Sequence, residues 1–180
     1  MKDESTRFTI AVIHRNGLGR LVCVLDSILT NISANDEVII IDNNSTDGSI
    51  GKIEKNSLYK DVKIIKNTCN TGYAFPCNQA MLLGNGRYFL LCNNDIRLPE
   101  KCLNEFEEIF NNSPQSGIIG GQLIDANKNM VGSYSKTPTF LSELDSIVRL
   151  RTPERYKTIH EVRTLRGACL AVRKETIESA

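Results

Sequence analysis

The sequence has few histidines, no closely spaced cysteine pair and no long apolar run, and each shortage argues against a class of protein. His14 and His160 are the only histidines in 180 residues, and the six cysteines include no Cys-x-x-Cys pair, so the composition does not favour a zinc site. Cysteines scattered through apolar runs are typical of free thiols in a reducing cytosol rather than of a disulfide framework. No apolar stretch is long enough to cross a bilayer, and the charged start, Met1 to Arg7, does not resemble a secretory signal. We therefore expect a cytoplasmic protein.

Net charge is also nearly absent. The chain carries 22 Lys and Arg against 21 Asp and Glu, so no overall field draws it towards nucleic acid. One segment differs: from Arg149 to Lys174 there are eight basic residues against Glu154 and Glu161. Such a run is typical of a solvated face. The alternative is a surface for an anionic acceptor or for the inner face of an acidic membrane.

Apolar segments alternate with helical patterns through the first 110 residues. Buried strands are predicted at residues 8–13, 38–41, 62–65 and 87–92, and helices at 18–29, 46–56, 75–83 and 98–110, the last with Pro99 in its first turn. Strands that are apolar throughout and alternate with helices imply a mostly parallel sheet covered on both faces. We expect a single, doubly wound α/β domain whose ligand crevice lies beyond the carboxyl ends of the strands.

The pattern becomes less regular after residue 111. Strands are predicted at 117–124, 130–134 and 164–172. The segment between the last two has weak periodicity, and one helix is predicted within it, at 139–150.

Two of the predicted strands run into polar clusters that contain a carboxylate. One strand ends at Asp42, and the other continues into Asn93, Asn94 and Asp95. An acid at such a strand end can bind a ribose or a base N–H. It can also hold Mg²⁺ or Mn²⁺, which need only one or two protein carboxylates when diphosphate oxygens complete the coordination. Equally, Asp42 can cap the following helix and Asp95 can form an Asx-turn, so the residue types leave both roles open.

The segment Gly17-Leu18-Gly19 is similar to the start of a dinucleotide-binding fingerprint, with Asp42 near the spacing of a ribose-binding acid. Val22 stands where the third small residue of that fingerprint is needed. Loop-to-helix turn chemistry is therefore the favoured explanation.

Five segments, taken in order, resemble the motifs of family 2 glycosyltransferases, in particular bacterial rhamnosyltransferase-like members. They are TIAVIHRN (9–16), IDNNSTDGS (41–49), NTGYAFPCN (70–78), LCNND with the following LP (91–95 and 98–99) and RGACLAVR (166–173). The resemblance implies an A-type glycosyltransferase fold, a nucleoside-diphosphate sugar donor and a Mg²⁺ or Mn²⁺ ion. It also implies inverting transfer of the sugar to a hydroxyl of a glycan or lipid-linked acceptor, as in polysaccharide biosynthesis.

The same resemblance assigns roles to individual residues and to the two halves of the chain. The residues expected to bind the nucleotide sugar are Ile13, Arg15, Asp42, Asn70, Asn78, Asn94 and Asp95. Asp95 and Asn93 are expected to hold the metal, and Gly167 and Ala168 to lie on the acceptor side. Residues 1–111 would form a nucleotide-binding half and residues 112–180 the start of an acceptor-binding half.

Three features depart from the family pattern. Arg15 stands where an aromatic residue usually precedes Asn16, Asn93 replaces the first acid of the metal motif, and the general base is expected beyond Ala180. Without a base, transfer should slow by roughly 10²–10⁴-fold. The first hypothesis is therefore the donor-binding portion of a glycosyltransferase. The alternatives are a non-catalytic nucleotide-sugar binding remnant and a sugar nucleotidyltransferase.

Overall fold

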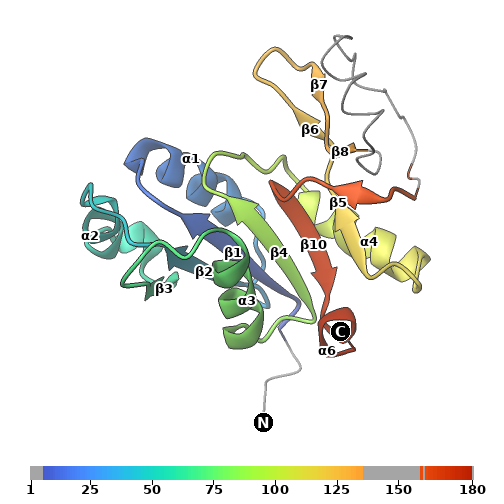
Figure 1. Cartoon of the computed structure of the whole chain (residues 1–180), viewed down its shortest axis with the longest axis horizontal. Helices are drawn as coiled ribbons and strands as arrows, with labels where there is room; N and C mark the ends of the chain where they lie inside the picture. Colours follow the sequence, from blue (N-terminus) through green and yellow to red (C-terminus); the bar gives the residue numbers. More distant parts are fainter. Residues whose placement is uncertain (1–5, 136–158, 160, 180) are drawn as a thin grey trace. The chain divides into compact units, whose positions relative to one another are not determined.

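A six-stranded sheet in the order β3-β2-β1-β4-β10-β5 forms the centre of the fold (Figure 1). The structure is a computed structural model that describes residues 6–135, 159 and 161–179. The strands are β1 (Phe8–His14), β2 (Glu37–Asp42), β3 (Lys63–Lys66), β4 (Tyr88–Asn93), β5 (Ile118–Gly120) and β10 (Cys169–Arg173). Strands β1 to β4 run parallel, and β10 pairs antiparallel with β4. The predicted mostly parallel α/β fold is confirmed.

Helices cover both faces of this sheet, as its uniformly apolar strands require (Figure 1). They are α1 (Leu18–Leu29), α2 (Ser49–Glu54), the 3₁₀ turn η1 (Ser57–Tyr59), α3 (Ala74–Leu83), α4 (Cys102–Asn112) and α6 (Lys174–Glu178). On one face, Ala80 of α3 packs into a buried cluster with Ala11 and Leu91. On the other, the ring of Phe110 in α4 stacks on Tyr88 at 4.7 Å between centroids. Within the described ranges, no helix has both the length and the apolar composition needed to span a membrane.

The chain divides into two compact units. The first comprises residues 1–119 and 168–180 and contains the sheet described above, and the second comprises residues 120–167. The described part of the second unit contains two short antiparallel pairs, β6 (Leu123–Ile124) with β7 (Met130–Val131) and β8 (Tyr134–Ser135) with β9 (Thr164–Leu165). The helix predicted at 139–150, and half of the basic residues that begin at Arg149, lie outside the described residues. The nucleotide and acceptor roles of residues 1–111 and 112–180 stay predictions.

Several element limits differ from the sequence predictions. The helix predicted at 98–110 begins only at Cys102, because Lys101 is left-handed (φ 65°) and the Cys102 N–H closes a turn on the Pro99 carbonyl at 3.3 Å. The strand predicted at 164–172 is two strands. Between them, the Arg166 N–H donates to Ser133 while the Ala168 carbonyl accepts from β4, so the two ends of the segment pair with different partners. The strands predicted at 117–124 and 130–134 are likewise divided.

Candidate functional site

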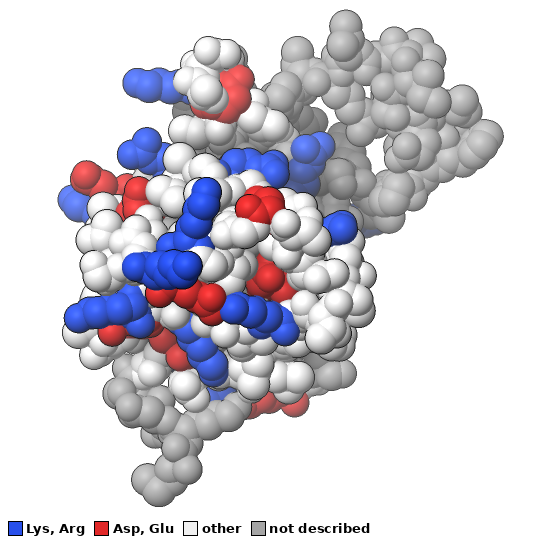
Figure 2. All heavy atoms as spheres, turned by 90° about the vertical axis from the view of Figure 1, so that its left-hand side faces the viewer, with Lys and Arg blue, Asp and Glu red and all other residues white. Residues whose placement is uncertain are grey.

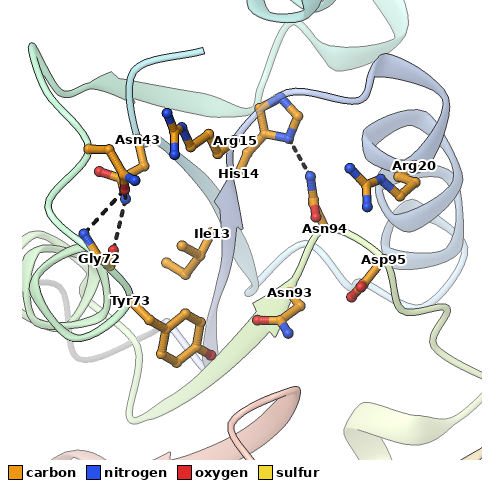
Figure 3. A pocket seen from close by; sticks show the side chains of 11 residues that line it. Ile13, His14, Arg15, Arg20, Asn43, Gly72, Tyr73, Asn93, Asn94 and Asp95 are labelled. Carbon is orange, nitrogen blue, oxygen red and sulfur yellow. Dashed lines mark hydrogen bonds between the residues drawn. The ribbon is translucent and has the colours of Figure 1, made fainter.

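A pocket of about 270 Å³ opens where β1, β2 and β4 end (Figure 3). The register of the sheet brings these ends together, because Ile13 pairs with Ile41 on one side and with Asn93 on the other. The carboxyl edge of a parallel sheet is the usual ligand position in this class of fold. The lining residues are Ile13, His14, Arg15, Arg20, Asn43, Asn70, Gly72, Tyr73, Asn93, Asn94 and Asp95.

The β4 side of the pocket presents polar groups that are not used by the fold. Asp95 is exposed, and its carboxylate has no hydrogen bond or ion pair to any described residue. The backbone N–H of Asn93 donates to the Ala168 carbonyl at 3.0 Å, while its side-chain amide stays available. Among the described residues, no three His, Cys, Asp or Glu side chains could hold a metal ion by themselves. One carboxylate beside amide oxygens fits Mg²⁺ or Mn²⁺ when a diphosphate supplies the remaining ligands.

The side-chain amide of Asn94 is held in place by a contact with the buried His14 (Figure 3). Asn94 Nδ2 lies 2.9 Å from His14 Nδ1 and donates to the Asn16 carbonyl at 3.1 Å. Since a carbonyl only accepts, the nitrogen is the donor at both contacts, so His14 Nδ1 accepts and the His14 proton is on Nε2, 2.8 Å from Ser49 Oγ. Because its Nδ1 accepts, the histidine is neutral. Burial lowers the pKa of His14, as does the charge of Arg20, although Asp42 and Asp47 act in the opposite direction. Asn94 Oδ1 has no hydrogen bond to a described residue.

The β2 side is held by Asn43, whose amide is saturated. Its Nδ2 donates to Asn70 Oδ1 at 2.7 Å and to the Gly72 carbonyl at 2.8 Å. Its Oδ1 accepts from the N–H and the hydroxyl of Thr71, both at 3.1 Å. Only 4% of Asn43 is exposed. This side chain therefore positions the 70–72 loop that forms one wall of the pocket.

Asp42 does not line the pocket. Its carboxylate accepts the Ser45 N–H at 3.1 Å and also the Ser45 hydroxyl, and only 5% of the residue is exposed. Asp42 therefore closes a turn and does not cap the following helix, the alternative given for it above, because the N-cap of α2 is Gly48. A contact between Asp42 and a nucleotide stays a prediction, because the pocket brings together Asp95 and Asn94 but not Asp42.

The other expected site residues are distributed as follows. Ile13, Arg15 and Asn70 line the pocket, whereas Asn78 is an exposed residue of α3 that does not. Ala168 is joined to Asn93 through the backbone hydrogen bond at the end of β4. Gly167 belongs to the second unit.

Five lining residues were not expected from the sequence: His14, Asn43, Gly72, Tyr73 and Arg20. The first four fall inside the motif segments quoted above, but the motifs did not indicate their roles. Asp47 accepts the N–H groups of Gly17 at 2.6 Å and Ser49 at 3.0 Å. The hydrogen bond from the Ser49 side chain lowers the pKa of Asp47 most, and the two bonds from backbone N–H groups lower it further. Together these bonds fix the loop between β2 and α2.

Comparison with known proteins agrees with this architecture. The sequence matches the model of glycosyl transferase family 2 over residues 9–178. The chain belongs to this family. No match was found among curated protein sequences.

Similar solved structures include two glycosyltransferase-fold proteins. The crystal structure of S. aureus TarS 1-349 matches with a TM-score of 0.67 and 17% identity over 97% of this chain and 49% of that one. The mannosyltransferase PcManGT from Pyrobaculum calidifontis, in complex with GDP-Man and Mn²⁺, matches with a TM-score of 0.64 and 19% identity over 99% of this chain and 48% of that one. TarS 1-349 in complex with UDP-GlcNAc also matches, with a TM-score of 0.65 and 17% identity over 97% and 47% of the two chains. At these identities the likeness concerns the fold, and this chain spans about half the length of each.

Proposed function

We propose that this chain binds a nucleoside-diphosphate sugar and serves as the donor-binding part of a glycosyltransferase. The observation that carries the proposal is the pocket at the sheet edge, where the unpaired Asp95 carboxylate lies beside the open amide oxygens of Asn93 and Asn94. Family membership supports transfer of a sugar from an activated donor. Two of the similar structures were determined with GDP-Man and Mn²⁺ and with UDP-GlcNAc, which makes a nucleotide sugar the reasonable ligand class.

In this proposal a divalent cation, Mg²⁺ or Mn²⁺, would be held by Asp95 and by the amide oxygen of Asn93. The ion would neutralise charge that develops on the departing nucleoside diphosphate. Arg15 and Asn70 would contact the nucleotide from the opposite wall, since both line the pocket. The sugar would pass with inversion to a hydroxyl of a glycan or lipid-linked acceptor, rhamnose being one donor sugar consistent with the sequence motifs.

We also propose that the general base is not supplied by these 180 residues. Among the described residues, Asp95 is the only acidic one that lines the pocket. Glu175 and Glu178 belong to α6, which follows β10 and contributes nothing to the pocket lining. A chain that binds the donor without transferring the sugar would then behave as the non-catalytic binding module. Family membership gives no support to the nucleotidyltransferase alternative.

The direct test is calorimetric titration of the purified chain with UDP, GDP and dTDP, each with Mn²⁺ and with EDTA. We expect one of these ligands to bind, more tightly with the metal. Equal affinity with and without metal would remove the cation from the proposal, and no binding by any of them would overturn the proposal itself. Mass spectrometry of the matching nucleotide sugar after incubation with simple glycan acceptors tests the second part. Transferred sugar would contradict a missing base.

Peripheral contact with an acidic membrane is a further part of this proposal, supported only by the excess of basic residues from Arg149 to Lys174. Co-sedimentation with phosphatidylcholine vesicles, with and without phosphatidylglycerol, tests it. We expect binding that requires the anionic lipid and weakens at high salt. Binding that is insensitive to both would count against it.

A further inference from the structure

One basic side chain at the pocket has no role in the fold or in the function proposed so far. Arg20 lies in the first turn of α1 and lines the pocket described above. It also lines a second pocket of about 230 Å³, with Gly19, Cys23, Asp95, Ile96 and Arg97. The two pockets therefore share Arg20 and Asp95. In Figure 3 the guanidinium of Arg20 points from α1 towards Asn94, on the same side of the pocket as Asp95.

The backbone at Gly17 makes room for this side chain. Gly17 has φ 93°, in the left-handed region that favours glycine. A Cβ atom built on it would lie 2.9 Å from both Nε and Nη2 of Arg20, too close for either to stay in place. The Gly17 N–H is itself held by the Asp47 carboxylate at 2.6 Å. The Arg20 guanidinium therefore packs against the loop that precedes α1, in space that a side chain at residue 17 would share.

The charge of Arg20 is not paired with an opposite charge within the described chain. Its guanidinium has no hydrogen bond or ion pair to a described residue, and the nearby Asp47 carboxylate is occupied by backbone N–H groups. On the face that Figure 2 shows, Lys and Arg are interspersed with Asp and Glu. Among the described residues, the lining of the pocket contains two arginines, Arg15 and Arg20, and one carboxylate, Asp95.

We propose that Arg20 binds the diphosphate of the donor. A guanidinium offers a planar fork of N–H donors that matches the oxygens of a phosphate. Because Asn93 would leave the cation with one protein carboxylate, the ion would be held mainly by the diphosphate, and Arg20 would supply further positive charge to the same phosphate oxygens. This inference rests on the proposed function, since it takes a nucleoside diphosphate as the ligand.

The test compares Arg20→Gln and Arg20→Lys with the wild-type chain by calorimetry. The ligands are the nucleoside diphosphate that binds the wild type best and the matching monophosphate, each with Mn²⁺ and with EDTA. We expect Arg20→Gln to weaken diphosphate binding about tenfold or more in both conditions, as for loss of a hydrogen bond to a charged group. Arg20→Lys should recover part of that loss, and the monophosphate should lose less than the diphosphate. Lys60→Gln, on an exposed residue after η1, is the control for overall charge.

A loss that persists in EDTA separates phosphate binding from an indirect effect on the metal. Removal of a positive charge next to Asp95 should leave the cation bound as tightly as before or more tightly, so a weakened metal site cannot explain a loss with Arg20→Gln. If the wild type binds a diphosphate and Arg20→Gln binds it equally well, this inference is overturned and the proposed function stands. If the wild type binds no diphosphate, the proposed function fails and this inference fails with it.

Gly17→Ala tests the same proposal without replacing Arg20. It should displace the guanidinium and weaken diphosphate binding, with little further effect in the Arg20→Gln background. Gly48→Ala is the matched control, because Gly48 is also left-handed (φ 73°) but has open space around its Cα. Equal losses from Gly17→Ala and Gly48→Ala would assign the effect to backbone strain and contradict the proposal. A larger loss with Arg97→Gln than with Arg20→Gln would place the diphosphate in the second pocket and would also contradict it.

Discussion

The two sides of the pocket use the same residue types in opposite ways. On the β2 side, the Asp42 carboxylate and the Asn43 amide are saturated by bonds to the protein's own loops. On the β4 side, the Asp95 carboxylate and the Asn93 amide have no such partners among the described residues. Saturated polar groups hold a structure in place, whereas open ones at a pocket are available to a ligand. The comparison indicates that the first side supports the loops, and it is consistent with the proposal that the second side binds the donor.

The largest effect is expected at Asp95. Asp95→Ala should weaken nucleoside-diphosphate binding in Mn²⁺ by about 1.5–3 kcal/mol, or roughly 10–150-fold, since it removes the only carboxylate at the proposed cation site. In EDTA the same substitution should have little effect. Titration calorimetry in both conditions measures the difference.

The control for Asp95→Ala is the free energy of unfolding of the variant. Asp95 is exposed and has no hydrogen bond or ion pair to a described residue, so its replacement by alanine should change the free energy of unfolding by no more than about 0.5 kcal/mol. Urea unfolding followed by circular dichroism measures this. A large loss of stability would mean that Asp95 supports the fold, which would remove the contrast between the two sides.

Asn43→Ala should act mainly on the fold. The substitution leaves the groups that Asn43 now satisfies, including the N–H of Thr71, without their partner, at a cost of about 1–3 kcal/mol. Urea unfolding should report that loss. Donor affinity should also fall, because the 70–72 wall is no longer held. Unchanged stability would show that the loop is fixed by other contacts.

Asp42→Ala should cost less stability and almost no affinity. Loss of the Ser45 N–H and hydroxyl bonds is comparable to loss of a helix cap, about 0.5–2 kcal/mol. Since 1 kcal/mol corresponds to about 2–4 °C in Tm for a chain of this size, differential scanning calorimetry can resolve the change. A strong loss of donor affinity with normal stability would instead restore Asp42 to the nucleotide site.

The smallest effect concerns the pH dependence that His14 contributes. Burial keeps the pKa of His14 below its ordinary value, so the unfolded chain takes up the proton first as the pH falls. The contribution of His14 to the free energy of unfolding is therefore full above pH of about 6.5 and declines as the pH falls below that value. We expect a loss of less than about 1 kcal/mol between pH 7.5 and 5.5.

The variant His14→Gln should show a smaller drop in Tm over the same interval. Comparison of the two proteins isolates His14 from the other groups that titrate. An identical pH dependence in both would contradict the neutral, buried state of the histidine.

The central sheet and its main helices could be predicted from the sequence because they follow from the spacing of apolar residues. The apolar stripe of α1 gives its limits, Leu18–Leu29, and the uniformly apolar strands give the mostly parallel sheet. Prediction was poorer where the limits of a helix or strand depend on the backbone conformation of one residue or on a distant pairing partner. The left-handed residue Lys101 delays the start of α4, and the short strands after residue 111 depend on pairing partners distant in the sequence.

The site could be predicted only in part for a related reason. Asp42 and Asp95 both follow buried strands, and the sequence cannot distinguish a carboxylate that closes a turn from one that faces a pocket. The role of Asn43 depends on the 70–72 loop, and the Arg20 side chain packs against Gly17, where a Cβ would crowd it. Such contacts are set by tertiary structure and leave no local pattern of residues.

The position of a bound metal ion tests the central contrast most directly. Crystals of the chain grown with Mn²⁺ and the nucleoside diphosphate that binds best would show the ion by its anomalous scattering. We predict one Mn²⁺ coordinated by the Asp95 carboxylate and by diphosphate oxygens, with Asp42 still bonded to Ser45. An ion coordinated by Asp42, or a diphosphate bound away from Asp95, would contradict this account.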